Sequence, residues 1–238
     1  MDSIDTGPAS NGRVPEAWHR SWTHFSIDRC SSGYCRVTFS HPPINTVTAT
    51  TVAELAELLA LIEGDEQLNV VVFGSANPDF YLAHYDSEHD PTRTAASGLS
   101  PTGIHAWLDL LVRLSRAPVI SIASIRGRAR GAGSEFVLAC DMRFASRENT
   151  ILGRFEVVTG RIPGGGTVSQ FSRLIGRGRA LEIMLIGDDL DGPRAEQYGY
   201  VNRTIDDVRL DAEVEALASR LARLDREAIV RAKSYVAV

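Results

Sequence analysis

Residues 117–146 read APVISIASIRGRARGAGSEFVLACDMRFAS, and their pattern indicates the class of fold. Residues 119–125 alternate between branched apolar and smaller side chains, as a buried strand does. Residues 131–133 are two glycines around an alanine, which is typical of a tight turn. An apolar helix is expected around 135–140 and a short strand at 142–145. The stretch therefore predicts a strand, a glycine turn, a helix and a second strand.

The same alternation of strands and helices extends along the chain in both directions. Thr50 or Thr51 is expected to cap a helix that ends at Gly64. Such alternation implies an α/β fold with right-handed crossovers. We expect a mobile polar tail at residues 1–20 and a single domain at residues 21–238. The further strands are expected at 22–28, 34–39 and 69–74, and the further helices at 51–63, 103–115, 176–186, 193–198, 208–223 and 226–235.

Composition excludes several classes of partner. The 238 residues include 25 Lys and Arg against 30 Asp and Glu, which gives a net charge of −5. A nucleic-acid-binding protein usually has a basic excess, and an anionic membrane attracts polybasic segments, so neither partner is expected. No apolar run approaches the roughly 20 residues that a membrane span needs. Cys30 and Cys35 lack the second pair that a zinc site needs, and the cysteines are expected to be reduced thiols of a cytoplasmic protein.

The glycine turn at residues 131–133 is the first candidate for chemistry. It begins like a dinucleotide-binding fingerprint, but the third small residue is missing. The sequence also has no Gly-x-Ser-x-Gly elbow and no Gly-x4-Gly-Lys-Ser/Thr phosphate loop. A glycine turn that enters a helix exposes backbone N–H groups at the positive end of the helix dipole. Such groups stabilise a developing oxyanion, so the turn indicates an acyl-type site.

Two carboxylates lie near glycine-rich segments. Glu135 falls in the first turn of the expected helix, where it either complements the helix end or takes part in a reaction. Glu156 lies in an otherwise apolar and glycine-rich region, where burial would suit it to proton transfer near neutral pH. The alternative for Glu156 is an ion pair with Arg154 or Arg161. Both interpretations of each residue stay open from the residues alone.

Three blocks of the chain have a recognisable order and spacing. They are Pro43-Ile44-Asn45-Thr46-Val47 with the helix and strand that follow, residues 117–146, and Gly153-Arg154-Phe155-Glu156 through Ile162-Pro163-Gly164-Gly165-Gly166 to Gly199-Tyr200-Val201-Asn202-Arg203. In these blocks the chain resembles the crotonase (enoyl-CoA hydratase/isomerase) superfamily over about residues 22–235. The resemblance implies a spiral of ββα units with C-terminal helices, here shortened at the C-terminus. It also implies a homo-oligomer, either a trimer or a dimer of trimers.

The resemblance implies a role for each matching residue. The substrate would be an acyl-CoA thioester, with coenzyme A carried as part of the substrate, no separate cofactor and no metal. The N–H groups of Tyr85 and Ala132 would form the oxyanion hole. Glu135 would activate the attacking water, and Glu156 would deliver a proton to the α-carbon of a 2-enoyl-CoA. The remaining substrate-binding positions would be Ala83, His84, Asp86, Gly131, Gly133, Pro163 and Gly164.

The sequence departs from the family pattern at His84, which stands where the family has glycine, and at Phe155, which replaces a proline. The alternatives to a hydratase are therefore an isomerase, another enolate reaction including C–C cleavage, and a non-catalytic acyl-CoA-binding protein. The His, Asp and Glu residues at 84–90 could form a metal site, and the alternative is that they belong to a solvated loop. Three basic residues precede the glycine turn and are expected on an exposed loop: Arg126, Arg128 and Arg130. They are either solvated there or contact the phosphates of coenzyme A.

Overall fold

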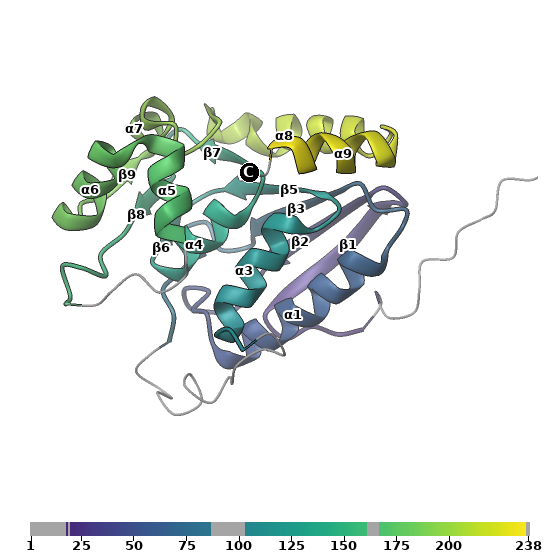
Figure 1. Ribbon diagram of the computed structural model, residues 1–238, viewed down its shortest axis with the longest axis horizontal. Helices are drawn as coiled ribbons and strands as arrows, with labels where there is room; N and C mark the ends of the chain where they lie inside the picture. The colour runs from purple at the N-terminus through teal and green to yellow at the C-terminus, as the bar shows by residue number, and fades with distance from the viewer. Residues whose placement is uncertain (1–17, 19, 87–102, 161–166, 237–238) are drawn as a thin grey trace, which may run out of the picture.

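A computed structural model describes residues 18, 20–86, 103–160 and 167–236 (Figure 1). Most of the expected tail at 1–20 lies outside these ranges. Its end does not fit the prediction of a mobile tail, because Trp18 is buried in the core and Arg20 forms an ion pair with Glu57. The packed part of the chain thus begins before residue 21.

The strands and helices follow each other in an α/β order. The strands are β1 (Phe25–Ser31), β2 (Tyr34–Phe39), β3 (Val70–Ser75), β4 (Phe80–Leu82), β5 (Ile120–Ile125), β6 (Arg128–Arg130), β7 (Met142–Ser146), β8 (Ile151–Gly153), β9 (Leu190–Asp191) and β10 (Arg203–Ile205). The helices are α1 (Ala49–Gly64), α3 (Ala106–Arg116), α4 (Ala132–Ala139), α5 (Thr167–Ile175), α6 (Arg177–Ile186), α7 (Gly192–Tyr198), α8 (Asp207–Leu221) and α9 (Arg226–Val236).

Within the described ranges, the strands form two sheets that repeat a ββα unit. The larger sheet has six strands in the order β1-β2-β3-β5-β7-β10, and the smaller has four in the order β4-β6-β8-β9. Strands β3, β5 and β7 pair in parallel in the first sheet, and each is followed by β4, β6 or β8 in the second. Helices α3, α4 and α5 come next in each case. The α/β spiral of ββα units is therefore confirmed.

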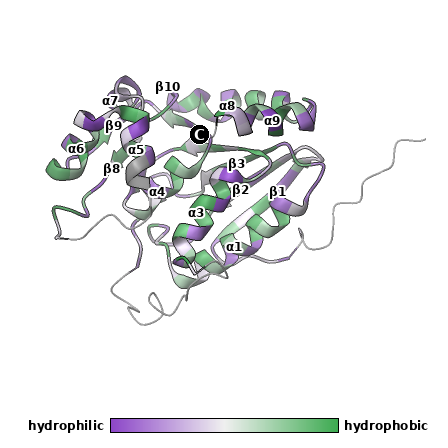
Figure 2. Ribbon diagram, viewed as in Figure 1, coloured by the Kyte–Doolittle hydropathy of each residue, from purple (hydrophilic) through white to green (hydrophobic). Residues whose placement is uncertain are grey.

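The larger sheet is buried on both faces. Val71 and Phe73 point into one hydrophobic cluster with residues of α1, α3 and α4, whereas Val70 and Val72 point into another with residues of α8. This is the expected result for a parallel strand with a continuous apolar run. Figure 1 shows α1 and α3 together in front of the sheet and α8 and α9 along the top of the view. Figure 2 shows hydrophobic residues along the central strands and mixed faces on α8 and α9.

Two predictions about local structure are wrong. Helix α1 is capped by Thr48, not by Thr50 or Thr51. Thr48 and Thr51 form a reciprocal pair, in which each hydroxyl accepts a hydrogen bond from the other's backbone N–H, so the threonine at the third helical position supports the cap. Residues 128–130 form strand β6 and not an exposed loop. Strands of three residues are too short to give an alternating pattern, which is also why β4 and β8 are not predicted.

Candidate active site

Helix α4 places Glu135 at one end of the glycine turn. Gly131 is the N-cap residue, with φ 52° and ψ −117°, a conformation that side chains rarely adopt. The Glu135 N–H donates to the Gly131 carbonyl at 3.0 Å, which closes the first helical turn. The Glu135 side chain is 6% exposed. The glycine turn therefore delivers a buried carboxylate to the N-terminus of a helix, as expected.

The segment 83–86 lies directly against this helix end. The Gly133 N–H donates to the Ala83 carbonyl at 3.0 Å, and the Ala83 N–H donates to the Asn45 carbonyl at 3.1 Å. Val47 forms an isolated parallel bridge with Tyr85. Segments far apart in the sequence thus fix residues 83–86 against α4.

Two backbone amides in these segments are candidates for binding a ligand. Within the described part of the chain, neither the Tyr85 N–H nor the Ala132 N–H donates to a backbone carbonyl. Both belong to segments that the Gly133–Ala83 hydrogen bond holds together. Because most backbone N–H groups in a folded protein have a partner, these two are candidate donors to an external acceptor.

The close approach of α4 to strand β4 requires a glycine. Gly133→Ala is expected to lower the free energy of unfolding by about 1–3 kcal/mol, because overpacking forces backbone shifts. A Cβ at Gly133 would lie 2.0 Å from the Leu82 carbonyl oxygen. Urea unfolding would measure the change. The matched control is Gly178→Ala in α6, where a Cβ meets nothing within 4 Å. Equal losses in the two variants would contradict the prediction.

Glu135 and Glu156 meet at one guanidinium group. Glu156 lies after strand β8, and the Arg154 Nη2 atom is 3.2 Å from Glu135 Oε1 and 3.3 Å from Glu156 Oε1. The exposed fraction of the side chain is 1% for Arg154 and 15% for Glu156. The ion pair considered for Glu156 is therefore present with Arg154, and it includes Glu135 as well. Arg161, the other partner considered, lies outside the described residues.

Trp107 is a site residue that the sequence does not reveal. Its indole Nε1–H donates to Glu135 Oε2 at 2.8 Å, so both oxygens of Glu135 accept hydrogen bonds. Trp107 stands in the first turn of α3, next to His105, whose ring accepts from the Trp107 backbone N–H. In sequence, an aromatic residue on an amphipathic helix is indistinguishable from a core residue.

Aromatic side chains lie around the glycine turn and Trp107. The rings of His84 and Phe155 lie 6.3 Å apart at their centroids, and a Cβ at Gly131 would be 3.5 Å from atoms of both. The Tyr85 ring lies edge-on to Trp107 at 6.2 Å. The two departures from the family pattern, His84 and Phe155, thus line the same turn. Asp86 is described beside them, whereas Pro163 and Gly164 lie outside the described residues.

Two buried side-chain oxygens of the candidate site have no hydrogen-bond partner among the described residues. They are Glu156 Oε2 and the hydroxyl oxygen of Tyr85. Such atoms need an explanation, because nearly all buried polar groups are hydrogen-bonded. A bound water or a polar substrate group between α4 and the segment after β8 would satisfy Glu156.

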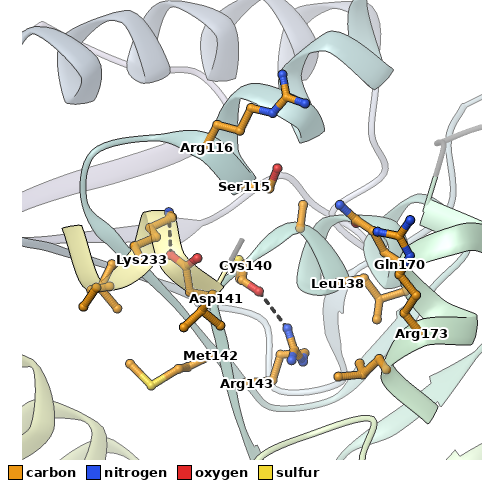
Figure 3. A pocket seen from close by; sticks show the side chains of 15 residues that line it. Ser115, Arg116, Leu138, Cys140, Asp141, Met142, Arg143, Gln170, Arg173 and Lys233 are labelled. Atoms are coloured by element: carbon orange, nitrogen blue, oxygen red, sulfur yellow. Dashed lines mark hydrogen bonds and ion pairs between the residues drawn. The ribbon is translucent and has the colours of Figure 1, made fainter. Parts of the chain in front are cut away.

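A separate cavity of about 700 Å³ lies at the opposite end of α4 (Figure 3). Three of its charged residues have partners: Lys233 pairs with Asp141 at 2.8 Å, and Arg143 donates to the Cys140 carbonyl at 2.7 Å. Burial also raises the pKa of the Cys140 thiol, which makes it a poor nucleophile. The lining therefore offers no acid–base pair comparable with the two glutamates.

Each of the three basic residues before the glycine turn has a protein partner. Arg126 contacts Asp207 at 2.8 Å, and Arg130 contacts Asp189. Arg128 lies over the Phe80 ring at 5.6 Å. Contacts of these residues to coenzyme A phosphates stay a prediction.

The described residues contain no group of three His, Cys, Asp or Glu side chains that could hold a metal ion. Glu88, His89 and Asp90, which belong to the metal alternative, lie outside the described ranges. All three cysteines are free thiols. No helix in the described part of the chain is long and apolar enough to cross a membrane.

Comparisons with known proteins agree on one family. A family model described as enoyl-CoA hydratase/isomerase matches residues 29–237. A structure from Streptomyces avermitilis, described as a candidate enoyl-CoA hydratase, has a TM-score of 0.84 at 42% identity and covers 91% of this chain and 78% of that one. An enoyl-CoA hydratase structure from Geobacillus kaustophilus has a TM-score of 0.78 at 28% identity, covering 90% and 81%.

Curated sequences give the same result over part of their length. The fatty acid oxidation complex subunit alpha of Shewanella amazonensis is 33% identical over 207 residues, which are 84% of this chain and 29% of that protein. The mouse enoyl-CoA hydratase domain-containing protein 2 is 32% identical over 162 residues, 68% of this chain and 53% of that protein. The chain thus spans about half or less of the length of these relatives.

Proposed function

The chain belongs to the enoyl-CoA hydratase/isomerase family of the crotonase superfamily, and we propose that it hydrates a 2-enoyl-CoA through an enolate held by backbone amides. The observation that carries the proposal is the pair of carboxylates, Glu135 and Glu156, which share one buried guanidinium at the N-terminus of α4. A protein that only binds acyl-CoA has no need of two acid–base groups there. The relatives named for fatty acid oxidation support an acyl chain as the substrate.

The amides of Tyr85 and Ala132 would hold the thioester oxygen. As negative charge develops on that oxygen, two N–H groups at a helix N-terminus stabilise it more than they stabilise the uncharged carbonyl. One such donor is worth roughly 3 kcal/mol in an acyl-type site. The hydrogen bond from Gly133 to Ala83 supports this role because it keeps the two segments together.

The two glutamates would divide the proton transfers. The water oxygen bonds to the β-carbon while Glu135 takes a proton from the water, and the π electrons of the double bond move toward the thioester oxygen. The enolate then collapses, and the α-carbon accepts a proton from Glu156. Glu135 then holds a proton and Glu156 has lost one. Transfer of that proton from Glu135 to Glu156 returns the site to its starting state.

The test of this proposal is turnover of crotonyl-CoA and of longer 2-enoyl-CoA thioesters by the intact chain. Hydration removes the conjugated double bond, so the absorbance of the enoyl thioester is expected to fall with saturable kinetics. The lack of any turnover across the panel, together with measurable binding of the thioesters, would overturn the proposal in favour of a non-catalytic acyl-CoA-binding protein.

The oxyanion role of Ala132 can be tested without disturbing the helix. Ala132 is the first residue of α4, a position at which proline is favoured. Ala132→Pro removes the N–H and is expected to lower kcat roughly 10²- to 10³-fold, as the loss of one oxyanion donor does. Ala132→Ser keeps the N–H and serves as the control, with kcat within about threefold of wild type. Comparable losses in both variants would exclude the amide as the cause.

Double-bond isomerisation is a second candidate function, favoured by the hydrogen bonds of the glutamates. Both oxygens of Glu135 accept hydrogen bonds from protein donors, whereas Glu156 Oε2 has no partner among the described residues. Glu156 alone would then take a proton from the α-carbon of a 3-enoyl-CoA and return it to the γ-carbon. A 3-enoyl-CoA substrate assayed for the appearance of conjugated absorbance distinguishes this reaction from hydration.

A further inference from the structure

One buried arginine contacts both carboxylates. Arg154 Nη2 lies within 3.3 Å of an oxygen of Glu135 and of an oxygen of Glu156. The two oxygens are therefore at most about 6.5 Å apart. The arginine thus sets the distance between the two groups that would handle the protons.

The charge of Arg154 is as important as its position. A guanidinium is always protonated, and its own burial is unfavourable unless carboxylates offset it. Conversely, two carboxylates buried close together repel each other, which favours protonation of one of them. The Arg154 guanidinium lies 5.8 Å from the centre of the Phe171 ring. Its anionic partners among the described contacts are Glu135 and Glu156.

We propose that Arg154 is a positioning residue whose buried positive charge holds Glu135 and Glu156 together as one group at the N-terminus of α4. The inference deepens the proposed function, on which its kinetic part rests. Arg154 stands two residues before Glu156 on the segment that leaves β8. A single side chain therefore fixes Glu156 from its own segment and Glu135 from α4.

Other titratable groups lie around the pair. His84 and Tyr85 lie on the segment after β4, and His105 is the N-cap residue of α3. The Tyr200 hydroxyl forms a hydrogen bond with the hydroxyl of Ser134 in α4. Burial raises the pKa of the Tyr200 phenol, which keeps it neutral over the working range. The two histidines are therefore the groups whose titration has to be separated from that of the glutamates.

Trp107 provides a readout of Glu135 that needs no enzyme activity. Its indole N–H donates to Glu135, so protonation of Glu135 is expected to change its fluorescence. The difference between wild type and Trp107→Phe isolates this signal from Trp18 and Trp22. A transition with pH that belongs to Glu135 disappears in Glu135→Gln, whereas one that belongs to His105 or His84 remains.

The decisive comparison is the midpoint of the Glu135-dependent transition in Arg154 variants. In Arg154→Met and Arg154→Gln the midpoint is expected to differ from that of wild type, because the carboxylate has lost an opposite charge in direct contact. In Arg154→Lys, which keeps a cation, most of the shift is expected to be absent. An equal midpoint in wild type and Arg154→Gln would overturn the inference.

A matched control separates loss of charge from loss of stability. Arg143 is another buried arginine, and it donates to backbone carbonyls at the far end of α4. Arg143→Met is expected to reduce stability without moving the Trp107 midpoint. A shift as large as that of Arg154→Met would overturn the inference.

Enzyme kinetics complete the test where the proposed function holds. Arg154→Gln is expected to lower kcat about tenfold or more with little change in KM, and to move the rising limb of the pH profile, whereas Arg154→Lys restores part of kcat. An unmoved limb with a raised KM would overturn the positioning role. If wild type turns over no enoyl-CoA, the proposed function fails, and the fluorescence midpoint still decides the inference about Arg154.

Discussion

Glu156→Gln is expected to lower kcat roughly 10²- to 10⁴-fold for both the hydration of a 2-enoyl-CoA and the isomerisation of a 3-enoyl-CoA. Both reactions need a group that transfers a proton at the α-carbon, and Glu156 is the carboxylate with an unpartnered oxygen among the described residues. Glutamine has nearly the same shape, and its carbonyl oxygen can still accept the hydrogen bond from Arg154. The loss should therefore fall on kcat and leave KM within a few-fold of wild type.

Steady-state kinetics on both substrates would measure this effect, with urea unfolding to confirm an intact fold. Glu182→Gln is a suitable control. Glu182 lies on the surface helix α6 and, like Glu156, is paired with an arginine, here Arg194 of α7. Its kcat is expected to stay within about twofold of wild type. A Glu156→Gln enzyme that retained more than a third of wild-type kcat on both substrates would exclude Glu156 as the proton donor.

The long elements of the fold could be predicted because their patterns are local. Helix α1 and strands β2 and β3 lie close to where the sequence pattern places them. Leu55, Leu58, Leu59 and Ile62 repeat at helical spacing, and β3 begins with four consecutive apolar residues. The smaller sheet could not be predicted. Its strands have two or three residues each, and they exist because hydrogen bonds to one another stabilise them, not because of their own propensity.

The candidate site follows the same division between local and long-range information. The order of the motif blocks identifies Glu135, Glu156 and the glycine turn, which are all local features. The contacts of Trp107 and Arg154 with Glu135 join residues 28 and 19 positions apart, and no local pattern reports them. Pro163 and Gly164 lie outside the described residues, and the trimeric assembly expected from the resemblance also stays a prediction.

Glu135→Gln is expected to separate the two candidate reactions. Hydration should fall roughly 10²- to 10⁴-fold, because the attacking water loses the carboxylate that takes its proton. Isomerisation uses no water, so its kcat should stay within about threefold of wild type. Trp107 and Arg154 donate to different oxygens of Glu135, so glutamine can accept from one of the two through its carbonyl oxygen while keeping the shape of the side chain.

The ratio of the two activities, measured on the same enzyme preparation, is the quantity that decides between mechanisms. Glu156→Gln lowers both activities and leaves this ratio near its wild-type value, whereas Glu135→Gln raises the ratio of isomerisation to hydration by two orders of magnitude or more, as roughly expected for one lost acid–base group. Equal losses in both reactions would mean that Glu135 acts on the whole site through Arg154, because the two carboxylates share that guanidinium. In that case the ratio in Arg154→Gln would resemble that in Glu135→Gln, and the pair would have to be treated as one catalytic unit.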